Sequence, residues 1–312
     1  MAHWRSVFAA VLLVGALGAF TGCGDDADSQ SGPREALIVV SPHPDDESIF
    51  GAATMHRLAA DPNRLLRVIY MSSGDRATKL GPCNGIPEKQ KIEMIIALRE
   101  TEARAAWKVI APNRDVPIDF LRGPDSRLVA ATSFANGVHV DTLSPAGQDA
   151  VDGAVAIATD LPASVRSVLF MTTAIYDAHP DHRTAYHAAR QAAQILYDQH
   201  HLAVTVWSWI VHDEQTDVDF PVCCGGDTHW PAAGPLNAYL DLTDVPPRRP
   251  RPPLWDHTED VRALVALRHD ALFQHVSQVR GNPALCMPVY VPDFYTRWVE
   301  KTEEPFYEEV LS

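Results

Sequence analysis

Short apolar runs alternate with longer amphipathic stretches along most of the chain. The short runs are rich in β-branched residues and bounded by Pro, Gly or polar residues, which is typical of buried strands. Strands are therefore expected at residues 36–40, 66–71, 116–121, 167–172 and 203–211. Helices are expected where apolar residues recur at helical spacing, at residues 48–60, 88–109, 148–161, 182–199 and 258–279. This alternation predicts an α/β fold with a mainly parallel sheet and helices on both faces.

Two segments lack the pattern of helix or strand. Residues 72–87 are rich in Gly, Pro and polar residues, and residues 75–87 are a candidate lid over the ligand edge of the sheet. Between residues 214 and 257 Pro and Gly are frequent, and residues 245–253 (VPPRRPRPP) are incompatible with a regular helix or a central strand. Residues 35–312 are expected to form one domain with a Pro-rich insertion and a C-terminal extension.

The N-terminal residues differ from the rest of the chain. Arg5 is followed by an apolar run at residues 7–20 that is too short for a permanent membrane span and fits a signal peptide. The run leads to Cys23, followed by a polar stretch, and resembles a bacterial lipoprotein signal, in which the cysteine is lipidated. The residue three before the cysteine is Phe rather than the more usual aliphatic residue, so secretion or a plain membrane anchor remains an alternative. We expect a signal peptide at residues 1–22, a flexible linker at residues 23–34, and export.

The composition excludes some classes of partner. The formal net charge is −14 at pH 7, whereas binding to nucleic acid needs clustered Lys and Arg. A polybasic membrane-binding surface is excluded for the same reason. The acidic excess says little about the substrate, because it also keeps a protein soluble.

Beyond Cys23 the chain has cysteines at positions 83, 223, 224 and 286. An even number in an oxidising compartment favours disulfides. Because the neighbours Cys223 and Cys224 seldom pair with each other, each is expected to bond to Cys83 or Cys286. The alternative is one disulfide and two buried thiols. There is no C-x-x-C sequence, so a zinc site made of thiolates is not expected.

Histidine and aspartate gather in two short motifs. The first motif is residues 42–47 (PHPDDE), between the first strand and the first helix, and the second motif is residues 179–182 (HPDH), after the fourth strand. Both would lie at carboxyl ends of parallel strands, where open α/β sheets bind ligands. Imidazole and carboxylate groups suit zinc, and a catalytic zinc keeps three protein ligands and an open position for water.

The ordered pair of motifs resembles the PIG-L/LmbE family of zinc-dependent N-deacetylases, which includes the glycosylphosphatidylinositol-pathway and mycothiol-pathway deacetylases. The resemblance covers residues 36–279 and implies a three-layer, Rossmann-like fold with a mainly parallel sheet. It also implies hydrolysis of N-acyl groups on glucosamine-type sugars and Zn²⁺ as the cofactor. The metal ligands would be His43, Asp46 and His182. Iron or manganese could occupy the same ligands.

The resemblance also assigns catalytic roles to three residues. Asp45 matches the general base that takes a proton from water, and His179 matches the histidine that stabilises the oxyanion. Asp181 would orient His179 or hydrogen-bond to a residue that ligates the metal. The chemistry agrees independently, because an amide is a poor electrophile and needs a Lewis acid, a base and a cation near the developing negative charge.

Several further residues are candidates for substrate binding. By the resemblance, Arg99 contacts the sugar, and the alternative is an ion pair with Glu102 on the same helix. Asp75 follows the second strand and could accept hydrogen bonds from hydroxyls, unless it belongs to an ordinary turn. His275 lies in ALFQHVSQ, which resembles a family segment whose histidine approaches the active site, and the alternative is a core histidine. Tyr176 could close over the substrate.

These features together predict an exported enzyme anchored at Cys23, or secreted, that removes the N-acetyl group from an N-acetylglucosamine-type sugar or glycoconjugate outside the cytoplasm. The partners expected are an N-acetylated amino sugar and, through lipidated Cys23, a membrane. Two alternatives remain: a metal-dependent hydrolase of another amide or ester, and a non-catalytic surface lipoprotein that binds glycans.

Overall fold

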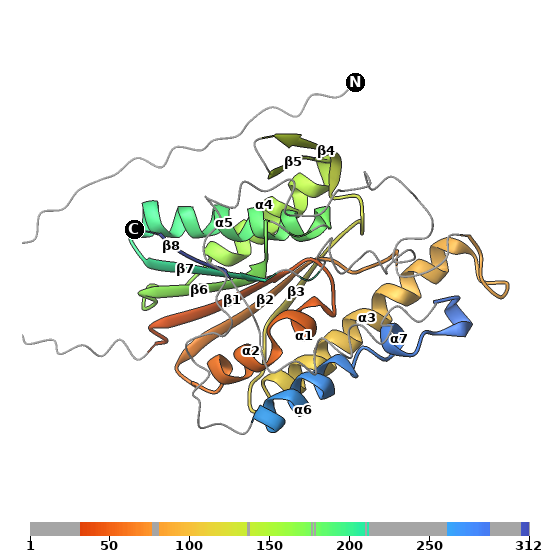
Figure 1. Ribbon diagram of the computed structural model, residues 1–312, viewed down its shortest axis with the longest axis horizontal. Helices are drawn as coiled ribbons and strands as arrows, with labels where there is room; N and C mark the ends of the chain where they lie inside the picture. Colours follow the sequence, from red (N-terminus) through yellow and green to blue (C-terminus); the bar gives the residue numbers. More distant parts are fainter. Residues whose placement is uncertain are drawn as a thin grey trace, which may run out of the picture. The chain divides into compact units, whose positions relative to one another are not determined.

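A six-stranded sheet forms the centre of the structure (Figure 1). The structure is a computed structural model and describes residues 32–76, 81–135, 138–175, 177, 179–209, 211, 261–287 and 307–311, which belong to the unit Gly32–Ser312. The predicted signal peptide, Tyr176, Cys223, Cys224 and residues 245–253 lie outside the described residues. In the described part, no helix has both the length and the apolar character that crossing a membrane requires.

The strand order is β3-β2-β1-β6-β7-β8, so the first strand lies near the middle of the sheet. Strand β1 pairs in parallel with both β2 and β6, β2 pairs in parallel with β3, and β6 with β7, whereas β8 is antiparallel to β7. The bounds are β1 Glu35–Ser41, β2 Arg64–Ser72, β3 Ile118–Gly123, β6 Ser167–Thr173, β7 Ala203–Trp209 and β8 Tyr307–Leu311. The expected mainly parallel sheet is confirmed.

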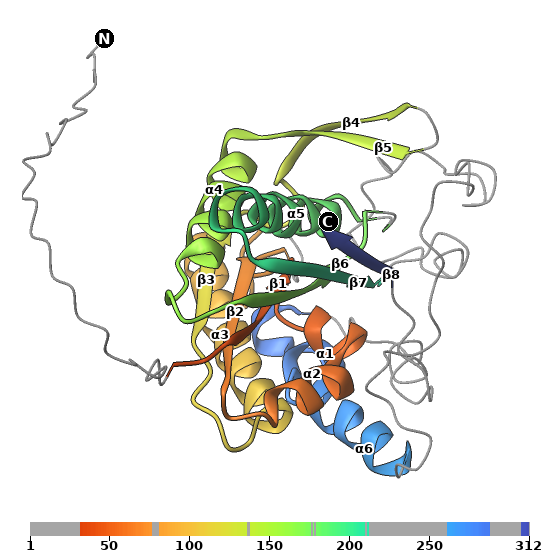
Figure 2. The same cartoon turned by 90° about the vertical axis from the view of Figure 1, so that its left-hand side faces the viewer.

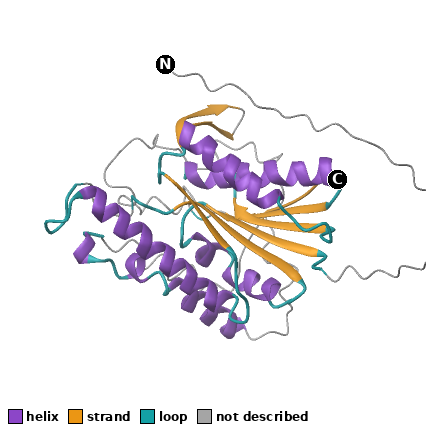
Figure 3. Ribbon diagram, turned by 180° about the vertical axis from the view of Figure 1, so that it is seen from behind, coloured by secondary structure: helices purple, strands orange, loops and turns teal. Residues whose placement is uncertain are grey.

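The sheet is buried on both faces, which explains why its strands are almost continuously apolar. In β1, Leu37 and Val39 belong to one core cluster, whereas Ala36, Ile38 and Val40 belong to the other. Helices α1 (Asp46–Phe50), α2 (Ala52–Ala59), α3 (Glu88–Ile110) and α6 (Val261–Leu272) cover the first face. Helices α4 (Pro145–Thr159) and α5 (Pro180–His200) cover the second face (Figures 2 and 3). The predicted three-layer, Rossmann-like arrangement is therefore confirmed.

Two predicted helices are interrupted. The helix expected at residues 48–60 divides into α1 and α2 at Gly51, where an added Cβ would lie 3.0 Å from the Cε atom of Met171 in the core. The helix expected at residues 258–279 ends with α6, and the chain continues after a turn in α7 (Val276–Val279). The turn brings the side chain of His275 into the interior, where it is 0% exposed.

A β-hairpin and the last strand were not predicted. Strands β4 (Val129–Ala135) and β5 (Val138–Leu143) form a separate two-stranded sheet outside the layer of α4 and α5 (Figure 1). Their exposed, polar positions hide the strand pattern, although the Asn136-Gly137 dipeptide between them is a hairpin signal. Strand β8 (YEEVL) was missed because two adjacent glutamates interrupt its apolar pattern.

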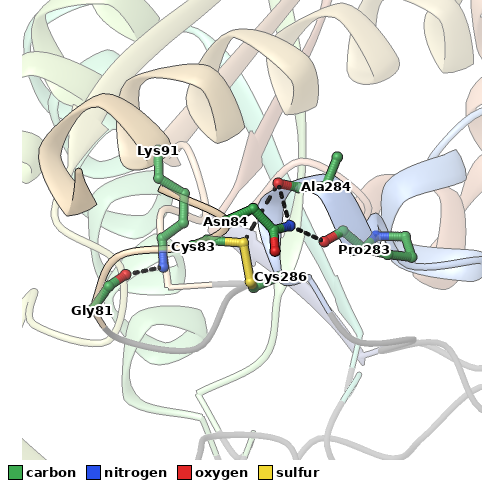
Figure 4. The surroundings of a disulfide bond; sticks show 7 residues. All are labelled: Gly81, Cys83, Asn84, Lys91, Pro283, Ala284 and Cys286. Carbon is green, nitrogen blue, oxygen red and sulfur yellow. Dashed lines mark hydrogen bonds between the residues drawn. A yellow bond between two sulfur atoms is a disulfide. The ribbon is translucent and has the colours of Figure 1, made fainter. Parts of the chain in front are cut away.

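A disulfide joins Cys83 to Cys286, which are 203 residues apart in sequence (Figure 4). The expectation that Cys83 and Cys286 would each pair with Cys223 or Cys224 is therefore wrong. Four cysteines allow three pairings, and sequence spacing does not choose among them.

The disulfide fixes part of the predicted lid. Cys83 and Ile86 exchange backbone hydrogen bonds of 3.0 and 2.8 Å across Asn84 and Gly85, whose φ values of 49° and 81° make a tight turn. The side-chain amide of Asn84 donates to the carbonyl of Pro283 at 3.1 Å. Residues 81–87 are thus tied to the segment at residues 283–287.

Candidate metal centre

The two motifs meet at the middle of the sheet. The first motif follows β1 and the second motif follows β6, and these two strands are hydrogen-bonded neighbours. From β1 the chain continues to β2 on one side, whereas β6 leads to β7 on the other side. The motifs therefore lie at a topological switch point, the position where such sheets bind ligands.

Three potential metal ligands converge there. The Nδ1 atom of His43 lies 3.1 Å from Oδ2 of Asp46, and Nε2 of His182 lies 3.3 Å from the same oxygen. All three side chains are buried, and one ligand atom from each lies within 4.8 Å of the others. Ligand atoms of a tetrahedral zinc site with bonds of about 2.0–2.1 Å lie about 3.3 Å apart. The donor set therefore fits a zinc ion.

Both histidines of this candidate set have carboxylate partners on their second ring nitrogen. Nε2 of His43 lies 3.3 Å from Oδ1 of Asp125 and 3.4 Å from Oδ2 of Asp181. Nδ1 of His182 lies 3.2 Å from Oδ2 of Asp177. Such partners fix the tautomer and the orientation of a metal-binding imidazole.

Sequence reasoning missed Asp125 and Asp177. Asp125 follows β3, and Asp177 lies between β6 and the second motif, so both lie beyond the carboxyl ends of strands. Their position after a strand is the sequence feature that could have marked them as site residues. It is weak evidence, because aspartates in loops more often cap helices or stabilise turns.

The carboxylates shift the pKa values of the ligands. Burial alone would lower the pKa of His182, but Asp177 and Asp46 outweigh burial and raise it to about 9. In the same way, burial lowers the pKa of His43, yet Asp125, Asp181 and Asp46 raise it well above its usual value. Burial would raise the pKa of Asp46, but the two histidines hold it well below its usual range. A cation that bound here would therefore compete with protons for the imidazoles.

Asp45 lies beside this donor set in an unusual backbone conformation, with φ 143° and ψ −29°. Its Oδ1 atom lies 3.1 Å from Nη2 of Arg99, and its backbone N–H donates to Oε2 of Glu47 at 3.1 Å. Burial raises the pKa of Asp45 to about 6, with Arg99 opposing the shift. A carboxylate with this pKa is suited to accept a proton near neutral pH.

The second motif supplies His179 and Asp181. Nδ1 of His179 accepts the backbone N–H of Asp181 at 3.1 Å, and the His179 ring lies 5.0 Å from the rings of both His43 and His182, measured between centroids. The carboxylate of Asp181 faces His43 and also accepts the backbone N–H of Ser126 at 2.7 Å. Its side chain therefore contacts a potential metal ligand, His43, as the second of the two roles expected for Asp181 requires.

Arg99 binds the first motif. Its guanidinium is buried and donates to the carbonyls of Gly74 at 3.0 Å and Pro44 at 2.6 Å, in addition to its ion pair with Asp45. Glu102 instead accepts hydrogen bonds of 2.7 and 2.6 Å from the backbone and hydroxyl of Ser277. The alternative of an ion pair between Arg99 and Glu102 is therefore not what the structure contains.

The other two candidates also have protein contacts. Asp75 accepts the backbone N–H of Asp125 at 2.8 Å and lies 3.4 Å from a guanidinium nitrogen of Arg127. Nε2 of His275 lies 3.0 Å from Oε1 of Glu47. The contacts of Arg99, Asp75 and His275 with a substrate stay predictions.

Comparisons with known proteins identify similar chains. Among solved structures, the conserved protein TT1542 from Thermus thermophilus shares 16% identity over 87% of this chain and 93% of that chain, with a TM-score of 0.43. N,N'-diacetylchitobiose deacetylase from Pyrococcus horikoshii shares 16% identity over 92% of this chain and 88% of that chain, with a TM-score of 0.43. The zinc inhibited form of teicoplanin deacetylase Orf2 shares 16% identity over 89% of this chain and 98% of that chain, with a TM-score of 0.41.

No curated protein sequence matches the chain significantly. A family model, however, described as GlcNAc-PI de-N-acetylase (PIG-L), matches residues 38–193, which is half of the chain. The matched region contains both motifs and all three potential metal ligands.

Proposed function

The chain belongs to the GlcNAc-PI de-N-acetylase (PIG-L) family, and from this starting point we propose that it is a zinc-dependent hydrolase that removes the N-acetyl group from an N-acetylglucosamine-type sugar or glycoconjugate outside the cytoplasm. One observation carries the proposal: His43, Asp46 and His182 converge as metal ligands, while Asp45 lies next to them with its carboxylate bound to Arg99 instead.

The donor set determines the chemistry. Zinc held by His43, Asp46 and His182 would act as a Lewis acid toward the amide carbonyl and the attacking water. Asp45 takes the proton of that water, since its pKa of about 6 leaves it ionised and moderately basic at neutral pH. Nδ1 of His179 accepts a backbone N–H, so the ring proton lies on Nε2, and this N–H would donate a hydrogen bond to the oxygen on which negative charge develops.

Other residues of the chain hold these groups in place. Arg99 fixes Oδ1 of Asp45 and the carbonyl of Pro44, so the base and the turn before it cannot move independently. Once protonated, Asp45 can return that proton to the departing amine nitrogen. Asp177 and Asp125 keep the ligand histidines oriented.

The location outside the cytoplasm is supported by two features. The N-terminal sequence up to Cys23 has the pattern of an exported lipoprotein, and the alternative is a secreted protein without the anchor. The disulfide between Cys83 and Cys286 favours an oxidising compartment. We therefore propose that the substrate is an extracellular or surface glycan, and that lipidated Cys23 attaches the enzyme to a membrane.

The test combines metal analysis with release of acetate from N-acetylglucosamine and its oligomers, using protein without residues 1–23. The parent should hold one zinc per chain and release acetate. Asp45→Asn should keep the metal and lose turnover, because only the base is changed, whereas His182→Ala should lose both. His56→Ala is the control for loss of an imidazole, because His56 contacts the carbonyl of Ile110 at 2.8 Å and no residue of either motif.

The outcomes separate the possibilities. Bound zinc without acetate release across the panel would redirect the proposal to other amides and esters, or to glycan binding without turnover. A parent that binds no zinc after reconstitution would refute the mechanism.

A further inference from the structure

The backbone of Asp45 is held in a conformation that an L-residue rarely adopts. Its φ of 143° lies far outside the left-handed helical region, in which the other described non-glycine residues with positive φ fall, at 49–57°. Such a conformation persists only when the surrounding structure holds it. Asp45 is also the proposed base, so whatever holds its backbone also directs its carboxylate.

Glu47 is the residue that holds this backbone. Its Oε2 atom accepts the N–H of Asp45 at 3.1 Å, while the carbonyl of Asp45 accepts N–H groups of Ser48 and Ile49 at 3.0 and 3.2 Å, in the first turn of α1. Glu47 is 0% exposed, so no bulk water competes for this hydrogen bond.

Glu47 is in turn held by a residue that is more than 200 positions away in the sequence. Its Oε1 atom lies 3.0 Å from Nε2 of His275 and accepts the hydroxyl hydrogen of Ser48 at 2.9 Å. His275 is also 0% exposed. It directly precedes α7, which is joined to α3 through Glu102 and Ser277. The position of His275 is therefore fixed by contacts independent of the first motif.

From this series of contacts we infer that Glu47 and His275 are a positioning pair for Asp45. His275 fixes the position of the Glu47 carboxylate, and Glu47 accepts the backbone N–H of Asp45. The Asp45 carboxylate is thereby held beside the metal ligands but does not become one of them. The inference rests on the proposed function, since it concerns the base of that reaction.

Loss of the pair should lower turnover without changing the atoms that hold the metal. Neither residue is among His43, Asp46 and His182, so removing the pair should leave one metal per chain. In Glu47→Ala the Asp45 peptide relaxes toward negative φ and its carboxylate moves. Because a displacement of about 1 Å in a reacting group costs on the order of 10²-fold in rate, kcat should fall by about that factor with little change in KM.

Matched variants distinguish a role in positioning Asp45 from a general effect on the stability of the protein. Glu47→Gln keeps an oxygen that can accept the Asp45 N–H, so it should recover most of the activity that Glu47→Ala loses. His275→Ala should lower kcat by a smaller factor. Because His275 acts through Glu47, the double variant Glu47→Ala/His275→Ala should be no slower than Glu47→Ala alone.

The control for lost side-chain hydrogen bonds is Arg114→Ala, at a partly buried position. The Arg114 guanidinium donates to the carbonyls of Ala59, Asp61 and Arg64 at 3.3, 2.8 and 2.7 Å, at the end of the sheet opposite the motifs. This variant should have a lower Tm with the kcat of the parent.

The experiment measures kcat, KM, zinc content and Tm for each variant, and determines crystal structures of the parent and of Glu47→Ala. Independent, additive losses in the double variant, unchanged kcat in Glu47→Ala, or an Asp45 φ still near the parent's value would each overturn the inference. If the parent releases no acetate, the proposed function fails, and the φ of Asp45 in the two crystal structures still decides whether Glu47 holds that backbone.

Discussion

Gly74 lies where the side chain of Arg99 passes the end of β2, and its replacement by alanine should destabilise the protein and slow its reaction. An added Cβ would lie 1.4 Å from Nη1 and 2.3 Å from Cζ of Arg99, and the φ of Gly74 is +62°. Gly85 is a matched control, because its φ is +81° but nothing lies within 4 Å of an added Cβ. Both substitutions place alanine at a positive φ, but only Gly74→Ala brings the new Cβ into a clash with Arg99.

The structure sets the size of the difference. A left-handed conformation costs an L-residue about 1–2 kcal/mol, and this is the whole effect expected for Gly85→Ala. In Gly74→Ala the guanidinium must leave the carbonyls of Gly74 and Pro44 and the carboxylate of Asp45. Breaking a buried charge pair in this way costs about 3–5 kcal/mol more.

Urea unfolding of both variants, followed by circular dichroism, measures these free energies. Gly74→Ala should lose several kcal/mol more than Gly85→Ala, and it alone should lose turnover, because Arg99 no longer holds Asp45. Equal losses in the two variants would refute the reasoning, since they would mean that the loop moves away from Arg99 at no cost.

Three further predictions concern the metal and the disulfide. Asp177→Ala should weaken zinc binding about 10–100-fold in a chelator competition, because the carboxylate that orients His182 is lost, while Asp198→Ala on the surface of α5 should leave it unchanged. The pKa of His182 is raised to about 9, so His182 is protonated at pH 7 in the metal-free protein, and the pKa of His43 is raised in the same direction. Zinc should therefore release at least about one proton and bind more tightly as pH rises toward 9. Calorimetry in buffers of different ionisation enthalpy counts the protons, and a count near zero would contradict these shifts. The double variant Cys83→Ala/Cys286→Ala should lose up to about 5 kcal/mol of unfolding free energy in urea, from the chain entropy of so long a loop, and a loss below about 1 kcal/mol would exclude that mechanism.

The parts of the fold that could be predicted are those whose local sequence has one strong pattern of apolar and polar residues. Residues 36–40 of strand β1 are all apolar because both faces of the strand are buried, and such a run is rarely anything but a buried strand. The hairpin of β4 and β5 gives no comparable signal, since Thr132 and Ser133 on β4 are exposed and the strands do not enter the main sheet. What decides that these residues form strands is their pairing with each other, which the Asn136-Gly137 dipeptide signals but the sequences of the two strands do not.

The site was predictable where residues are adjacent in sequence and not where they meet only in the fold. His43 and Asp46 share one loop, and placing the second motif at the next strand end needed only the strand order. Asp125 and Asp177 are single loop aspartates, and their roles depend on which imidazole nitrogen faces them. The contacts of Arg99 could not be predicted for another reason. Its partners Pro44 and Gly74 lie on the loops after β1 and β2, and helical spacing does not tell how far these loops lie from α3.

The disulfide has a consequence for proteolysis. The Cys83–Cys286 bond closes a covalent ring that contains the second motif, whereas the first motif precedes the ring. A protease that cuts once inside the ring, for instance in the Pro-rich insertion, releases no fragment, because both pieces remain joined through sulfur. Both motifs then stay on one covalent molecule, which would separate into two bands on a gel only after reduction. Inside the ring, separating the two motifs requires either one cut between residues 84 and 178 together with reduction of the bond, or two cuts that flank the second motif. A cut between the first motif and Cys83 lies outside the ring, and the disulfide gives no protection there.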